Sequence, residues 1–103
     1  MTKTEPAQPK RLYGFCWFHR ADYDRARGAM ADPDILFETY DEWLKAAKKI
    51  EAEVSARGDK VVRIRFDLAA FLLYCVSHDT LPNEQARAAW AAAEARKKYT
   101  GRP

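Results

Sequence analysis

A chain of 103 residues has room for one domain, and its 48% hydrophobic and 13% aromatic residues suffice for a core, which excludes global disorder. The net charge of +3 is too small to indicate a dedicated nucleic-acid binder, and no stretch approaches the roughly 20 apolar residues of a membrane span. We therefore expect a cytoplasmic protein with a disordered tail over residues 1–10, a single domain over 11–98 and a C-terminal tail over 99–103.

The first predicted strand is the uncharged, aromatic-rich run Leu12-Tyr13-Gly14-Phe15-Cys16-Trp17-Phe18-His19, with its strand proper at 11–18. Both of its faces are apolar, so both must be covered. Gly14 within it indicates a bulge or a close approach of another backbone. Residues 20–30 then predict a short helix that puts Tyr23, Ala26 and Met30 on one side.

Asp32-Pro33-Asp34 predicts a turn, and the apolar link at 35–37 is expected to tuck under the core. A second helix follows, since Thr39 and Glu42 form a capping-box pattern and Gly58 supplies a stop. Its expected core stripe consists of Trp43, Ala47, Ile50 and Val54.

The second predicted strand, at 60–66, alternates, with Arg63 and Arg65 on the face opposite its apolar residues. Asp67 is expected to cap a third helix at 68–77, and Asn83 a fourth that runs to about Lys98 with Trp90 as its large anchor. The prediction is an α+β fold with the order β-α-α-β-α-α and a small two-stranded sheet. Such a sheet is marginal alone, and dimerisation could complete it.

The two cysteines and two histidines form a Cys2His2 set, Cys16-x-x-His19 and Cys75-x-x-His78, which raises the hypothesis of a zinc site. Residues three apart on a strand face opposite sides, and both cysteines lie in apolar runs. Buried thiols are therefore the favoured interpretation, and no metal or cofactor is predicted. His19 with the nearby acids could also assemble a general acid–base pair, but a strand-to-helix junction residue is the favoured role, and no catalytic residue is assigned.

The candidate functional surface lies on the strands. If they are adjacent, one sheet face belongs to the core and the other combines aromatic rings with guanidinium groups. The interface candidates are Tyr13, Phe15, Trp17, His19, Arg63 and Arg65. Aromatic residues and Arg are enriched in protein interfaces, yet they also stack bases and hold phosphates, and helices of the same chain could simply cover them.

The segments GFCWFHRADYDR, ADPD-x-L-x-x-TYDEWL, VVRIRFD and FLLYC resemble a family of short bacterial proteins with no assigned activity. The resemblance covers roughly Leu12 to Trp90. It implies a bacterial, cytoplasmic, single-domain protein, and no site residue comes with it.

The leading functional hypothesis is a non-enzymatic interaction or regulatory module that self-associates through the aromatic strand at 12–19 or binds another protein, without a membrane. The alternative is a single-stranded nucleic-acid-binding module that uses the strand aromatics with Arg63 and Arg65, and Lys45, Lys48 and Lys49 as phosphate contacts. A small enzyme centred on His19 is the third hypothesis.

Overall fold

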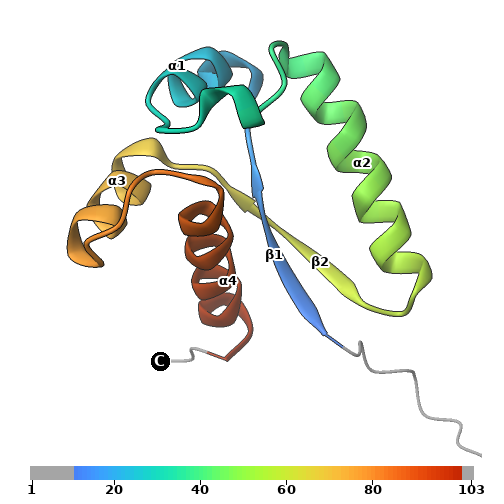
Figure 1. Cartoon of the computed structure of the whole chain (residues 1–103). Helices are drawn as coiled ribbons and strands as arrows, with labels where there is room; N and C mark the ends of the chain where they lie inside the picture. Colours follow the sequence, from blue (N-terminus) through green and yellow to red (C-terminus); the bar gives the residue numbers. More distant parts are fainter. Residues whose placement is uncertain (1–10, 101–103) are drawn as a thin grey trace, which may run out of the picture.

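Two parallel strands form the centre of the computed structural model, which describes residues 11–100 and the side chains of 11–98. Parallel strands need a crossover connection, which two helices and two single-turn 3-10 helices supply here. The elements in chain order are β1 (Leu12–Trp17), η1 (Arg20–Asp22), α1 (Tyr23–Gly28), η2 (Pro33–Ile35), α2 (Tyr40–Ala56), β2 (Lys60–Arg65), α3 (Leu68–Ser77) and α4 (Glu84–Thr100) (Figure 1). This confirms the predicted α+β class and element order.

The ends of the chain differ in part from the expected tails. Residues 1–10 and 101–103, predicted as tails, lie outside the described residues. Helix α4 continues to Thr100, so residues 99–100 are helical rather than part of a tail.

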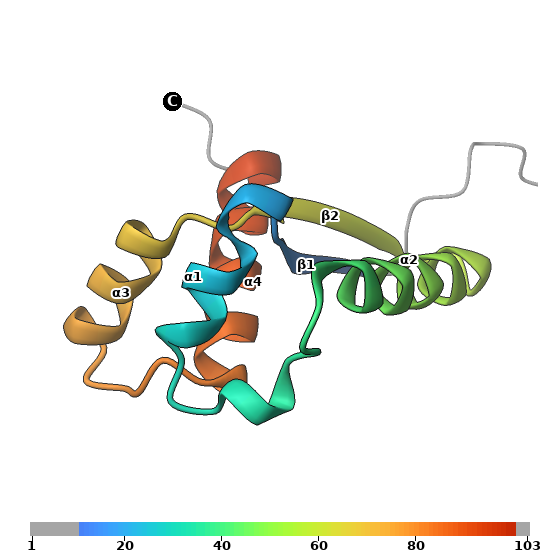
Figure 2. The same ribbon diagram turned by 90° about the horizontal axis from the view of Figure 1, so that it is seen from above.

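Helices cover both faces of the sheet. The register places Gly14 opposite Val62 and Cys16 opposite Ile64, and α4 packs on this face. The other face, which includes Trp17, meets α2, whose Trp43 ring lies edge-on to Trp17 at 5.2 Å between centroids. Figures 1 and 2 show α2 and α4 on opposite sides of β1.

Gly14 allows α4 to approach β1 closely, as its position within the strand predicts. A Cβ atom at Gly14 would lie 2.6 Å from the Ala91 carbonyl carbon and 3.0 Å from the Ala95 Cβ. Ala91 and Ala95 are themselves buried, so small residues on both elements bring the helix backbone against the strand.

The first helix, predicted over residues 20–30, is a 3-10 turn at Arg20–Asp22 followed by α1 at Tyr23–Gly28. The predicted caps of the other three helices and the stop at Gly58 are confirmed. Thr39 Oγ1 accepts a hydrogen bond from the Glu42 amide at 3.1 Å, and the Glu42 carboxylate accepts one from the Thr39 amide. Asp67 and Asn83 cap the N-termini of α3 and α4 through their side chains. Gly58 takes a left-handed φ of 91° just beyond α2.

An aromatic core lies where the two strands end. Phe18 contacts Trp43 of α2, Tyr23 of α1 and Phe66 after β2. Phe66 in turn contacts Trp90 of α4, so one ring cluster joins most of the elements. The strand ends at Trp17, one residue before the predicted boundary, because Phe18 turns inward to this cluster.

Three apolar residues that the sequence predicted to be buried in the core are exposed. Ile35 and Phe37, expected to tuck under the core, are 56% and 45% exposed, and only Leu36 between them packs inward. Ile50, expected in the core stripe of α2, is 45% exposed. All three face a groove beside β1 rather than the interior.

Candidate functional site

The structure divides the six predicted interface residues between two hollows. Tyr13 and Phe15 line an apolar groove beside β1, which we call the strand-edge groove. The remaining four line a basic hollow where the strands end, which we call the carboxyl-end pocket; they are Trp17, His19, Arg63 and Arg65.

The strand-edge groove has a volume of about 540 Å³ and runs along the side of β1 that faces away from β2. Residues 12–16 form its floor, α2 and α4 form its walls, and the link at 35–37 borders it. The α2 wall consists of Trp43, Ala46, Ala47 and Ile50, and the α4 wall of Glu84, Arg87, Ala88 and Ala92. Only two of these residues, Glu84 and Arg87, are charged.

The floor of this groove carries unpaired backbone groups. The Arg11 and Trp17 carbonyls accept from β2, at Lys60 and Phe66. Because backbone groups alternate in direction along a strand, the N–H and C=O groups of Leu12, Gly14 and Cys16 point away from β2. Within residues 11–100 these groups find no hydrogen-bond partner.

Large exposed hydrophobic side chains gather at the same groove. Seven such residues occur in the described part of the chain, and four of them line it: Leu12, Ile35, Phe37 and Ile50. The sequence did not predict this cluster, since the helical spacing of Ile50 indicates a core position. Exposed apolar residues that adjoin one another mark interaction sites.

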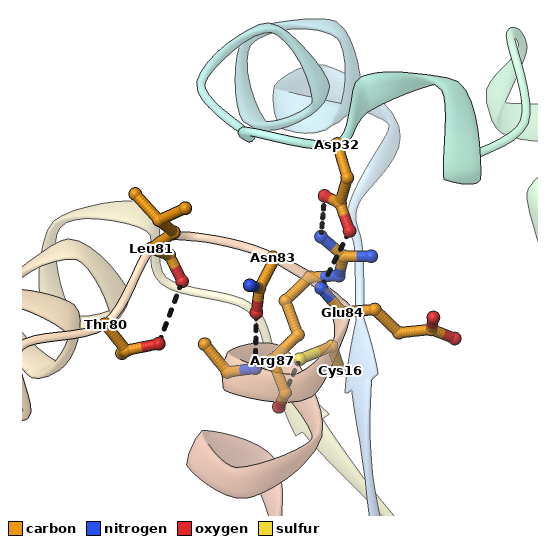
Figure 3. A network of polar contacts seen from close by, with 8 residues as sticks. Cys16, Asp32, Thr80, Leu81, Asn83, Glu84 and Arg87 are labelled. Carbon is orange, nitrogen blue, oxygen red and sulfur yellow. Dashed lines mark hydrogen bonds and ion pairs between the residues drawn. The ribbon is translucent and has the colours of Figure 1, made fainter.

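A largely buried ion pair lies beside the groove at the start of α4 (Figure 3). The Arg87 side chain is buried and donates to Asp32 at 2.9 Å, while the other Asp32 oxygen accepts the Glu84 amide at 2.8 Å. Burial alone would raise the pKa of Asp32, but the hydrogen bonds from Arg87 and Glu84 outweigh it and lower that pKa below 3.8. The predicted turn at Asp32 therefore also ties η2 to α4.

The carboxyl-end pocket has a volume of about 410 Å³, and none of its lining residues is acidic. Its residues come from the ends of both strands, from η1 and from the start of α2. They are Trp17, Phe18, His19, Arg20, Tyr40, Arg63 and Arg65.

Two of its guanidinium groups are held in place by an aromatic ring and a carboxylate each. Arg63 lies over the Trp17 ring at 4.0 Å and donates twice to Glu51 at 2.8 Å, which lowers the pKa of Glu51. Arg20 lies over the Tyr40 ring at 4.6 Å and donates to Asp41 at 2.7 Å. These contacts fix both guanidinium groups at the rim of the pocket.

Arg65 and His19 differ from these two arginines. Both side chains are exposed, and neither makes a hydrogen bond or an ion pair with the part of the chain that the structure describes. The pocket thus combines two anchored cations with two groups whose donors are unused.

No family model, curated protein or solved structure matches this chain. The resemblance to a family of short bacterial proteins therefore stays a prediction. The fold, the groove and the pocket carry the functional argument.

The four residues of the Cys2His2 set do not assemble. No three His, Cys, Asp or Glu side chains within the described range are close enough to hold a metal ion. Cys16 donates to the Arg87 carbonyl at 3.5 Å, Cys75 lies in the core, and the exposed His78 stacks on Tyr74. His19 lies in the carboxyl-end pocket instead.

We expect both thiols to be inert in the folded protein. Burial raises the pKa of Cys16 to about 12 and also raises that of Cys75. Labelling with a thiol-specific disulfide reagent at pH 8 is expected to be at least about 100-fold slower than in the urea-unfolded chain, since the thiolate is the reactive form. A rate for either cysteine close to that of the unfolded chain would contradict this.

The membrane and enzyme hypotheses gain no support from the described residues. No helix within residues 11–100 is both long and apolar enough to cross a bilayer. His19 has arginines and aromatic rings beside it in the pocket, whereas Asp22 lines a different hollow with Arg25 and Arg65. Of the acids near His19 in the sequence, Asp22 thus lines a neighbouring hollow, which shares Arg65 with the carboxyl-end pocket.

Proposed function

We propose that this protein is a non-enzymatic interaction module that self-associates by pairing the free edges of β1 from two copies. The observation that carries the proposal is the row of unpaired backbone groups on β1 at the bottom of an apolar groove. A strand edge in that state is a template for another strand.

The chemistry of β1 fits the groove that it lies in. The strand Leu12–Trp17 contains no charged residue, and of the charged groove residues Arg87 already has Asp32 as its partner. A second β1 would therefore enter an apolar groove without leaving a buried charge unpaired. The two free thiols, Cys75 buried and Cys16 partly buried, also suit the reducing cytoplasm that the sequence predicts.

Pairing about a two-fold axis satisfies the outward backbone groups of β1 in both copies at once. In an antiparallel arrangement centred on Gly14, Leu12 of each copy lies opposite Cys16 of the other, and the outward N–H and C=O groups of all three residues are paired. The sheet then grows from two strands to four, which removes the marginal stability of a two-stranded sheet.

Solution mass tests this proposal. We expect light scattering to give twice the chain mass of 11.9 kDa at micromolar concentration. Leu12→Lys and Ile50→Lys, which put a charge in the groove, should each weaken the dimer by at least about tenfold in Kd, or about 1.4 kcal/mol. Leu73→Lys is the matched control, because Leu73 is 67% exposed and lies outside the groove.

Hydrogen exchange adds a readout that is specific for the strand edge. Amides of Leu12, Gly14 and Cys16 should exchange more slowly as the protein concentration rises, whereas those of Tyr13 and Phe15, which face β2, should not change. A monomer mass at all concentrations would overturn the proposal. So would a dimer that only Leu73→Lys disrupts, since the contact would then lie on α3.

The geometry supports pairing of copies more than it supports base stacking. The Arg63 guanidinium covers the Trp17 ring and is engaged by Glu51, so neither side chain is open to a base. Lys45, Lys48 and Lys49 are exposed on α2. Absence of a gel shift at low salt is the expected result for single-stranded nucleic acid.

A further inference from the structure

We propose that the carboxyl-end pocket binds a phosphate group, either inorganic phosphate or the phosphate of a small monoester. This inference is independent of pairing at β1, because its residues lie at the ends of the strands and most of them are outside the strand-edge groove. Either proposal can therefore fail without the other.

The position of the pocket is the first reason. β1 and β2 are parallel neighbours, and the end of β1 with the segment after it shares one hollow with Arg63 and Arg65 at the end of β2. In sheets of parallel strands, ligands bind outside the carboxyl ends. The side chains that line the pocket at that point are basic, aromatic or apolar, and the carboxylates of Glu51 and Asp41 contact Arg63 and Arg20 from outside the lining.

The donors left unused by the protein are the second reason. A guanidinium has five N–H groups. The hydrogen bonds of Arg63 to Glu51 use Nε and one Nη2 hydrogen, and the hydrogen bond of Arg20 to Asp41 uses Nη2 alone, so each guanidinium retains donors. The Arg65 side chain retains all of its donors, since it makes no hydrogen bond or ion pair within the described residues.

The arrangement favours a tetrahedral anion over a flat carboxylate. Its cationic donors come from two elements: Arg20 from η1, and Arg63 and Arg65 from one face of β2. Phosphate oxygens point to the corners of a tetrahedron and can accept from several elements at once, and Arg is the side chain most often used for them. The rings of Trp17 and Tyr40 hold two of these guanidiniums before any ligand arrives, which reduces the entropy lost on binding.

Phosphate titration of the full chain tests this inference. We expect saturable NMR shifts at residues 17–20 and 63–66 when ¹⁵N-labelled protein is titrated with inorganic phosphate or glycerol 3-phosphate at low ionic strength. Sodium chloride at equal ionic strength serves as the salt control. If only glycerol 3-phosphate saturates, the ligand is an organic monoester; if both do, phosphate itself is recognised.

Substitutions locate the binding. Arg65→Gln should weaken binding by at least about tenfold, because it removes a charged donor. Arg20→Gln should weaken it as well, which keeps the test valid if one variant unfolds. Lys98→Gln is the matched control, because it removes the same charge from α4, outside the pocket, and should bind as the unmodified protein does. Shifts that do not saturate, or binding unchanged in both arginine variants, would overturn the inference.

Discussion

Replacing Gly14 by alanine should destabilise the protein by about 3 kcal/mol, the upper end of the usual cost of overpacking a core. The added methyl group would press against the Ala91 carbonyl and lie 3.0 Å from the Ala95 Cβ. The first obstacle is backbone, so α4 must move as a body to relieve it. Urea unfolding followed by circular dichroism measures the loss as a lower midpoint with an unchanged slope.

Gly28→Ala is the matched control for Gly14→Ala. A Cβ atom at Gly28 would meet nothing within 4 Å, and Gly28 is the last residue of α1. The same chemical change is therefore expected to raise stability by up to about 0.5–1 kcal/mol, through helix propensity. Equal effects of the two substitutions would contradict the close approach of α4 to β1.

Asp32→Ala should destabilise the protein by a comparable amount, about 3 kcal/mol. This value is at the low end of the cost of breaking a buried ion pair, because part of the Asp32 carboxylate reaches solvent. The substitution leaves Arg87, which is only 6% exposed, without its partner and removes the acceptor of the Glu84 amide. Urea unfolding at pH 7 provides the measurement. Asp34→Ala, two residues away and exposed, should change stability little.

The same ion pair predicts a dependence on pH. The pKa of Asp32 is lower in the folded protein than its ordinary value of 3.8, so the folded state binds the proton less readily than the unfolded chain does. Its stabilisation is therefore complete above about pH 5 and is lost as the pH falls through the folded-state pKa. The stability difference between the unmodified protein and Asp32→Asn should be constant at neutral pH and shrink below pH 3.8. A difference that grows toward low pH would contradict this assignment.

Local sequence signals predicted the elements well because their causes are local. Capping by Thr39, Asp67 and Asn83 depends on residues within one helical turn, and the left-handed turn at Gly58 depends on one residue. The close approach at Gly14 is one of the two alternatives that the sequence left open there, the other being a bulge. The sequence could not name that neighbour, because α4 lies more than 70 residues further along the chain.

The exposure of individual side chains was predicted less well. Trp17, an interface candidate, is only 8% exposed within the single chain, because Trp43 and Arg63 cover it, and its place at an interface stays a prediction. Ile35, Phe37 and Ile50 were expected inside and lie on the groove. Helical spacing identifies the apolar side of α2, but it does not say whether that side meets a sheet along its whole length.

The aromatic strand β1 shows most clearly which features follow from the sequence and which follow from the tertiary structure. The sequence by itself determined that residues 11–18 hold a strand with two apolar faces, that two strands and four helices form the fold, and where the second, third and fourth helices begin. The tertiary structure decided that both faces are covered within the chain, by α2 and α4. The outer edge of β1 stays uncovered, because its one neighbouring strand pairs only the backbone groups on its other side. The pairing of strands depends on contacts between residues far apart in sequence, and periodicity along one segment does not contain that information.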